Sequence, residues 1–151
     1  MTQSAVEVVR GFFRSAALGD THGIRQYLRD DTRWTVPGRH PLAGTHHGPV
    51  EIAALFRELH KASFVTKSLF LAADGNHVVE VHTGRSNTGD AADVETLWAM
   101  IFTVEDGKIR EARGFVADQY LADNFFARHY SLAPLPGRLA AGQPLQGDRT
   151  P

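Results

Sequence analysis

The stretch that decides the fold is Ala92–Ala117, which reads ADVETLWAMIFTVEDGKIREARGFVA. The pair Asp106-Gly107 near its centre predicts a two-residue hairpin loop, because a type I′ turn needs positive φ at both positions and this dipeptide adopts it at little cost. Such a loop would place Glu105 opposite Lys108 and would set the register of both strands. We therefore expect an antiparallel pair of strands here.

One face of this hairpin would carry an arginine among aromatic residues. Counting from the loop places Met100 opposite Arg113, and on the same face Trp98 opposite Phe115 and Phe102 opposite Glu111. The other face would carry Leu97, Ala99, Ile101, Ala112, Gly114 and Val116. Apolar residues on both faces favour a central pair covered on both sides, with the arginine face as a pocket wall. Alternatively, Arg113 spans the sheet surface with its guanidinium in water.

Composition restricts the class of protein. With 151 residues, 42% of them hydrophobic, the chain can bury a core within one domain. A net charge of -1 without a basic tract indicates no nucleic-acid partner. Cysteine is absent, which excludes disulfides, thiolate nucleophiles and cysteine-based metal sites. No stretch resembles a membrane span, and charged residues interrupt the apolar N-terminal segment, so we expect a cytoplasmic protein without a membrane partner.

Helical periodicity dominates the first part of the chain. Ser4 can cap a helix whose apolar stripe includes Phe13 and continues to Ala17. Thr21 could cap a short second helix, and a Gly-Pro pair opens a third helix over residues 48–62. A last short helix is expected over residues 118–128.

Strand patterns dominate the second part. A turn at Asp30-Asp31 precedes a short strand, and a polar loop and two further strands come before the hairpin: Arg33–Val36, the loop Arg39–His47, Val65–Ala73 and His77–Arg85. Helices first and strands last predict an α+β domain over residues 1–130, in which the N-terminal helices pack on one face of a curved antiparallel sheet. Residues 131–151 are rich in Pro and Gly, which favours a flexible tail or an arm draped on the surface.

This order of elements, with RWTVPGRHPLAGTHHG leading into a helix and EDGKIREARGF closing the sheet, resembles the nuclear transport factor 2-like superfamily. Within it, the chain is most similar to the SnoaL-like polyketide cyclase and ketosteroid isomerase-like group, from about Ser4 to Phe126. The resemblance implies a conical α+β barrel with a small-molecule pocket at its open end, usually in a homodimer formed through the sheet. Members include isomerases, cyclases, dehydratases, epoxide hydrolases and non-catalytic binding or scaffold proteins, so the fold alone does not define an activity.

The resemblance also indicates which catalytic groups this chain lacks. The ketosteroid isomerase base corresponds to Val36, and the tyrosine of its oxyanion hole falls on Phe12. Its second aspartate, near the place of the acid/base aspartate of the cyclases, falls on Met100. The Arg-x-Asp of the epoxide hydrolases would be Trp98 and Met100. This chain therefore lacks the proton-transferring group on which ketosteroid isomerase and epoxide hydrolase chemistry depend.

His82 is a catalytic candidate. The tripeptide HTG at 82–84 is similar to the His-Thr-Gly of the cyclases, in which the histidine lies in the pocket and polarises or protonates the substrate. Glu80 shares its strand face. A connection of two or four residues at 87–90 would place His82 opposite Glu95 and away from the tryptophan face, whereas three or five residues, or a bulge, would reverse this. Paired with either glutamate, His82 could exchange protons near neutral pH, and otherwise it is a surface or dimer-interface residue.

Other residues would bind the substrate or assist its reaction. Asp118 could act as a base if a bulge turns it inward, and otherwise it caps the helix that follows. Arg113 would hold a carboxylate, phosphate or enolate oxygen through paired hydrogen bonds. An apolar lining suited to a polycyclic or polyene ligand, with a histidine at its mouth, would comprise Phe12, Trp34, His40, Trp98, Met100, Phe102 and Phe115. These residues could instead be the core of the cone.

The sequence therefore favours a cofactor-independent enzyme that cyclises, isomerises or dehydrates an apolar, polyketide-like small molecule. His82 and Arg113 would stabilise negative charge, while Asp118, Glu80 or Glu95 would move a proton. The alternatives are a binding protein for a hydrophobic metabolite and a dimerisation scaffold with a filled cavity. The histidines at 40, 46 and 47 match no metal-ligand spacing, so no metal site is expected.

Overall fold

The computed structural model describes residues 3–89, 91 and 93–130, and the tail expected from residue 131 lies outside these residues. The elements run in the order α1 (Ala5–Ala17), the 3₁₀ helix η1 (Gly23–Tyr27), β1 (Leu28–Val36), β2 (Gly44–His47), α2 (Gly48–Lys61), β3 (Val65–Asp74), β4 (His77–Arg85), β5 (Glu95–Glu105), β6 (Lys108–Val116) and α3 (Gln119–His129). The α+β class with helices on a curved sheet is thus confirmed. No helix in this part of the chain combines the length and the apolar character needed to cross a membrane.

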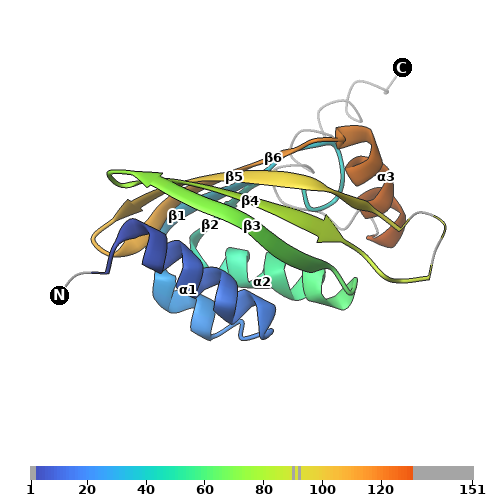
Figure 1. Ribbon diagram of the computed structural model, residues 1–151. Helices are drawn as coiled ribbons and strands as arrows, with labels where there is room; N and C mark the ends of the chain where they lie inside the picture. The colour runs from blue at the N-terminus through green and yellow to red at the C-terminus, as the bar shows by residue number, and fades with distance from the viewer. Residues whose placement is uncertain (1–2, 90, 92, 131–151) are drawn as a thin grey trace, which may run out of the picture.

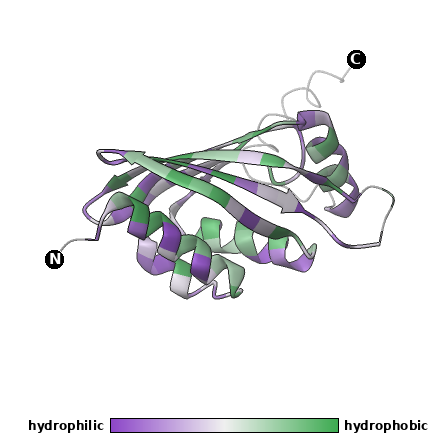
Figure 2. Ribbon diagram, viewed as in Figure 1, coloured by the Kyte–Doolittle hydropathy of each residue, from purple (hydrophilic) through white to green (hydrophobic). Residues whose placement is uncertain are grey.

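The strands form one six-stranded sheet in the order β2-β1-β6-β5-β4-β3. Neighbouring strands are antiparallel except β1 and β6, which are parallel. Figure 1 shows α1 and α2 side by side beneath one face of the sheet, with α3 at the end of β6. In Figure 2, hydrophobic residues alternate with hydrophilic ones around α1 and α2, which is typical of helices that bury one side against a sheet.

Helix α1 begins as its sequence predicts. The Ser4 hydroxyl accepts a hydrogen bond from the Glu7 amide, and the Glu7 carboxylate accepts one from the Ser4 amide. This reciprocal pair satisfies two of the amide groups that have no partner at a helix start. Val8, Val9 and Phe12 are then buried on the side that faces the sheet. The cap and the apolar stripe therefore act together to place the helix.

Two of the expected non-regular segments are strands. Asp30-Asp31 lies inside β1 rather than in a turn, and β2 occupies the end of the loop expected over 39–47. Asp31 is accommodated at the surface, where its carboxylate accepts a hydrogen bond from Arg29 at 2.8 Å. Neither strand is stabilised within its own segment, because β1 pairs with β6, which is distant in the chain, and the edge strand β2 pairs with β1. The local sequence therefore underestimates them.

The short helix η1 also differs from the expectation. His22 rather than Thr21 stands at its N-terminus, and it makes no side-chain capping bond. The Asp20 carboxylate instead accepts a hydrogen bond from the Gly23 amide at 2.7 Å. An aspartate just before the turn therefore performs the role that the threonine was expected to perform.

The hairpin turn forms as predicted, but the register beyond it does not. Asp106 and Gly107 have φ values of 53° and 72°, and Glu105 pairs with Lys108. A bulge then shifts the register between Thr103 and Val104. The extra residue is in β6, and it transfers every later side chain of β6 to the face opposite to the one expected. The expected pairs of residues 98, 100 and 102 with residues 115, 113 and 111 are therefore wrong.

The observed pairs put two large apolar residues of β5 against small residues of β6. Met100 lies opposite Gly114, Phe102 opposite Ala112, and Trp98 opposite Val116. The core beneath them contains an aromatic cluster in which Phe12 stacks on Trp34 at a centroid distance of 5.0 Å. Small residues in β6 leave room above this cluster, where the cavity described next is found.

Candidate functional site

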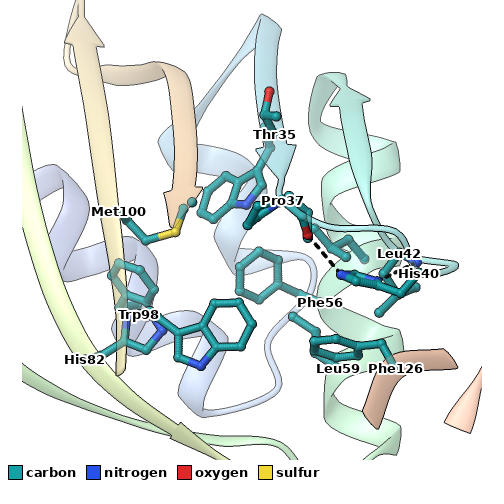
Figure 3. Close-up of a pocket in the computed structure, with 15 residues that line it drawn as sticks. Thr35, Pro37, His40, Leu42, Phe56, Leu59, His82, Trp98, Met100 and Phe126 are labelled. Carbon is teal, nitrogen blue, oxygen red and sulfur yellow. Dashed lines mark hydrogen bonds between the residues drawn. The ribbon is translucent and has the colours of Figure 1, made fainter. Parts of the chain in front are cut away.

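A cavity of about 80 Å³, which we call the inner cavity, opens between the sheet, α2 and α3. Its walls include Trp34 from β1. Figure 3 shows Trp98 and Met100 from β5 and Phe56 and Leu59 from α2 around it. The volume exceeds the roughly 10–15 Å³ that one water molecule occupies by this measure. It is smaller than the roughly 300–1,000 Å³ of most ligand pockets. A ligand of ordinary size therefore requires some wall side chains to move.

His82 lies on the wall of this cavity. Residues 86–94 connect β4 to β5, and the residues on either side of them, Arg85 and Glu95, lie opposite each other. This register places His82 opposite Trp98 on the concave face of the sheet. Figure 3 shows the two side chains next to each other, and their rings are nearly parallel at a centroid distance of 6.5 Å. Glu95 is exposed on the other side of the sheet and is not the partner of His82. An odd number of connecting residues decides this placement.

The partner of His82 is Glu80, two residues earlier on the same strand face. His82 Nδ1 and Glu80 Oε2 are 2.6 Å apart, and the two residues are 7% and 1% exposed. When Nδ1–H donates to the carboxylate, Nε2 carries the lone pair of the neutral imidazole. A buried carboxylate that orients an imidazole beside a cavity is an arrangement suited to a general acid/base.

Gly84 explains the third position of the HTG tripeptide. A Cβ atom there would lie 2.6 Å from Trp98 Nε1 and 2.8 Å from Phe64. Because residues 82 and 84 share a strand face, the glycine makes room for the indole beside the histidine. Trp98 Nε1 is buried without a hydrogen-bond partner among the described residues. The tripeptide thus supplies both the imidazole and the space in which the tryptophan packs.

Two buried histidines, one of which lines the cavity, bind the backbone of the segment before α2. His40 is buried, its Nδ1 accepts a hydrogen bond from the Leu42 amide, and its Nε2–H donates to the Pro37 carbonyl at 3.0 Å. The His46 imidazole is paired with the Leu42 carbonyl at 2.8 Å. The described part of the chain contains no group of three or more residues arranged to hold a metal ion. His40 therefore lines the cavity with both ring nitrogens engaged in hydrogen bonds to the backbone.

Helix α3 closes the side of the cavity with Phe126. The Asp118 carboxylate accepts a hydrogen bond from the Leu121 amide, so this residue caps α3, as the alternative interpretation expected, and it does not line the cavity. At the other end of the helix, the Tyr130 hydroxyl donates to the Glu58 carbonyl at 2.5 Å. Burial, and secondarily the negative charge of Glu58, raises the pKa of Tyr130, so its hydroxyl stays protonated.

The expected lining is found in part. Four of the seven predicted substrate contacts line the cavity: Trp34, His40, Trp98 and Met100. Phe12 and Phe102 are fully buried behind it in the core. Phe13 lines the cavity instead of Phe12, because neighbouring helix residues point in directions about 100° apart. The apolar stripe of α1 already contained Phe13 and was the signal that could have identified it.

The sequence predicted Arg113 and Phe115 on the face of the sheet that lines the cavity, and this prediction is wrong. After the bulge they lie on the convex side of the sheet, where Arg113 is opposite Ile101 and Phe115 is opposite Ala99. Both side chains are exposed, and Phe115 retains 48% of its accessible surface. The guanidinium therefore does not reach the cavity, and the alternative of a residue on the sheet surface agrees with the structure.

Fold and cavity together define an α+β protein in which helices pack on a curved sheet around a mainly apolar cavity. Residues 9–112 match the SnoaL-like domain family, and the chain belongs to that family. Uncharacterized proteins of Mycobacterium bovis and Mycobacterium tuberculosis are 29% identical to it over 133 residues, which cover 84% of this chain and 100% of theirs.

Solved structures share the NTF2-like fold. Bal32a, from a soil-derived mobile gene cassette, aligns with a TM-score of 0.76 at 22% identity over 81% of this chain and 95% of its own. An NTF2-like protein from Burkholderia xenovorans LB400 aligns with a TM-score of 0.67 at 29% identity, over 81% and 95%. An LEH-like epoxide hydrolase from M. tuberculosis has a TM-score of 0.67 at 24% identity, over 95% and 98%. The expected superfamily is thus confirmed.

Proposed function

We propose that this protein is a cofactor-independent enzyme that cyclises, isomerises or dehydrates an apolar, polyketide-like small molecule in the inner cavity. The observation that carries the proposal is the buried Glu80–His82 pair on the wall of an otherwise mainly apolar cavity. Apolar walls suit a hydrophobic substrate body, and one oriented imidazole suits proton transfer at a single oxygenated position.

In the proposed reaction, His82 Nε2 takes a proton from the carbon next to a substrate carbonyl. The electrons of the broken C–H bond form the C=C bond of an enolate, and Glu80 stabilises the imidazolium. Return of the proton to another carbon completes an isomerisation, and its transfer to a departing hydroxyl releases water in a dehydration. In a cyclisation, the enolate carbon attacks a second carbonyl and the alkoxide receives the proton. Such proton transfer contributes roughly 10²–10⁴-fold in rate, and positioning contributes further.

The geometry reduces the number of residues that can take part in the proposed reaction. Arg113, Asp118 and Glu95 do not line the cavity, so proton transfer is assigned to His82 with Glu80 as the group that positions it. Val36 and Met100 do line the cavity at the places where the resemblance expects acids. This supports a route different from ketosteroid isomerisation and from epoxide hydrolysis.

The test starts with binding and continues with chemistry. Polyketide-like ligands are screened by thermal shift, and each hit is incubated with the protein and analysed for products. Turnover that is lost in His82→Ala and retained in Arg113→Ala supports the proposal. A product formed equally well by His82→Ala contradicts it.

A non-catalytic carrier of a hydrophobic metabolite is the second candidate. It is favoured by the same apolar walls and by a valine and a methionine where the resemblance expects acids. The presence of a cavity disfavours a scaffold whose cone is filled with side chains. Ligand binding without product, at protein concentrations equal to the ligand, would support the carrier.

We also propose that the protein forms a homodimer through the convex face of the sheet. Exposed apolar residues from four strands gather there: Phe70, Val79, Leu97, Ile101 and Phe115. The pairing places these side chains on one side of the sheet, away from α1 and α2 (Figure 1). A contiguous apolar surface of this kind favours association, because burial removes it from water.

A further inference from the structure

Helix α2 separates the inner cavity from a second one. The second cavity, which we call the lateral cavity, has a volume of about 250 Å³ and lies between α2, the end of α1 and the turn that follows. Asp20 and Thr21 line it from the turn, and Arg57 and His60 line it from α2. It is therefore larger and more polar than the inner cavity.

Phe56 belongs to the walls of both cavities. Successive residues of a helix are rotated by about 100°, so the order around α2 is Leu55, Leu59, Phe56, His60 and Arg57. The first two line only the inner cavity, and the last two line only the lateral cavity. The phenylalanine therefore stands as the partition between an apolar compartment and a polar one.

The partition is held by aromatic contacts that a rotation can break. The Phe56 ring packs edge-on against Phe12 and Trp34, at centroid distances of 5.1 and 5.2 Å, and the residue is half-buried. Figure 3 shows Phe56 from α2 among the residues that surround the inner cavity. Because the inner cavity is small, movement of this ring gives a larger ligand access to space that already exists beyond it.

We propose that Phe56 sets the length of the ligand that the protein accepts, and that the lateral cavity takes a carboxylate at the far end of a longer apolar chain. The proposal rests on the proposed function in one respect, that the inner cavity holds an apolar ligand. Among the described residues, the Arg57 guanidinium has no ion-pair partner. The Asp20 carboxylate is engaged with the Gly23 amide. A ligand carboxylate would accept charge-assisted hydrogen bonds from Arg57, with His60 beside it.

The experiment measures binding against chain length. Straight-chain alcohols and carboxylic acids, hexyl to hexadecyl, displace the neutral fluorescent probe N-phenyl-1-naphthylamine from the wild type and from Phe56→Ala. Each methylene that finds an apolar environment raises affinity by about fourfold until the cavity is full. Phe56→Ala is expected to move the length at which affinity stops rising to longer chains, and Phe56→Leu to move it less.

Leu59→Ala is the matched control, because it removes a large side chain from the inner cavity alone. In Leu59→Ala, the chain length at which affinity stops rising is expected to increase only by as many methylenes as fit into the volume of the deleted side chain. A shift in Leu59→Ala as large as that in Phe56→Ala overturns the role of the partition. Circular dichroism and thermal melting establish that each variant is folded, and Phe56→Leu serves as the test if Phe56→Ala does not fold.

The polar end is tested by Arg57→Ala in the Phe56→Ala background. The double variant is expected to bind a long acid about tenfold more weakly than Phe56→Ala, while the alcohol of equal length is unaffected. Equal losses for acid and alcohol overturn the carboxylate assignment. If the wild type binds short chains and no variant changes the length limit, this inference fails while the proposed ligand site stands. If the wild type binds no member of the series, both fail.

Discussion

Both faces of the sheet are rich in apolar residues, yet charged side chains are buried as a pair on one face and exposed to water on the other. On the concave face, which α1 and α2 cover, Glu80 and His82 are buried together at 2.6 Å. On the convex face, Arg113 is exposed among apolar neighbours such as Ile101 and Phe115. Covering one face raises the cost of every charge on it, so that face keeps a paired acid and base. Apolar composition alone therefore does not distinguish a ligand site from a surface.

The largest expected effect is the loss of catalytic activity when His82 on the concave face is removed. His82→Ala should lower kcat on an identified substrate by about 10²–10⁴-fold, because the proposed proton carrier is lost. Arg113→Ala should leave kcat unchanged. Steady-state kinetics measure both, and added imidazole should restore part of the activity of His82→Ala. Failure of imidazole to restore any activity, with the variant folded, would argue for a merely structural histidine.

The next effect concerns stability at the same pair. His82→Ala leaves the Glu80 carboxyl group buried without its partner, which should cost about 3–5 kcal/mol of unfolding free energy. The double variant Glu80→Gln/His82→Ala should recover part of this loss, since no buried charge remains. Urea unfolding of the two single variants and the double variant gives the coupling. Additive single effects would show that the pair contributes no stability through its contact.

The convex face is tested by a charge that breaks its apolar surface. Ile101→Lys should shift a dimer towards monomer in analytical ultracentrifugation, and the unfolding free energy of the monomer should change by no more than about 0.5 kcal/mol. Val50→Lys, on the exposed side of α2, is the matched control and should not alter association. A wild-type protein that sediments as a monomer at all concentrations would rule out the proposed dimer.

The smallest effect concerns the connection that places His82 on the concave face. The Asp93 carboxylate accepts hydrogen bonds from Ser86, Thr88 and Gly89, and the bonds from Thr88 contribute most to holding its pKa well below the usual value. A lowered folded-state pKa stabilises the fold at pH above about 4, and this contribution is lost as the pH falls below that value.

Asp93→Asn should therefore lower the urea midpoint modestly near neutral pH. The difference between wild type and variant should shrink as the pH falls towards about 3, because the Asp93 carboxylate of the unfolded chain then takes up a proton while that of the folded chain stays ionised. A difference that stays constant over this range would assign the effect of the substitution to something other than the charge of Asp93.

Local signals predicted the elements whose ends are decided by nearby residues. The Ser4 cap, the Gly-Pro start of α2 and the Asp106-Gly107 turn each act within a few residues, and each forms as expected. The first half of β1 and the strand β2 were missed, because β1 pairs with β6, which is distant in sequence, and β2 is an edge strand that pairs with β1 alone. Asp30-Asp31 has the local character of a turn, and within β1 it falls in the irregular stretch between Leu28 and Arg33, both of which pair with β6.

The candidate site was predicted in its residue types more than in its geometry. His82 and Glu80 were both named, and four of the seven predicted lining residues surround the cavity. Phe13 and Phe56 were not predicted as site residues, since their roles follow from the directions in which two helices present them. Arg113 was assigned to the cavity on a register that ignored the bulge in β6.

By itself, the sequence determined the order of the helices and of most strands, the hairpin turn and the position of a histidine and a glutamate on one strand face. These depend on dihedral preferences and on the alternation of side chains within a strand, which act locally. Only the tertiary structure decided which face of the sheet became the cavity wall. One bulge and the number of residues in one connection set the parity of whole strands, and helix packing then covered one face. For this reason His82 lies at the cavity and Arg113 lies outside it.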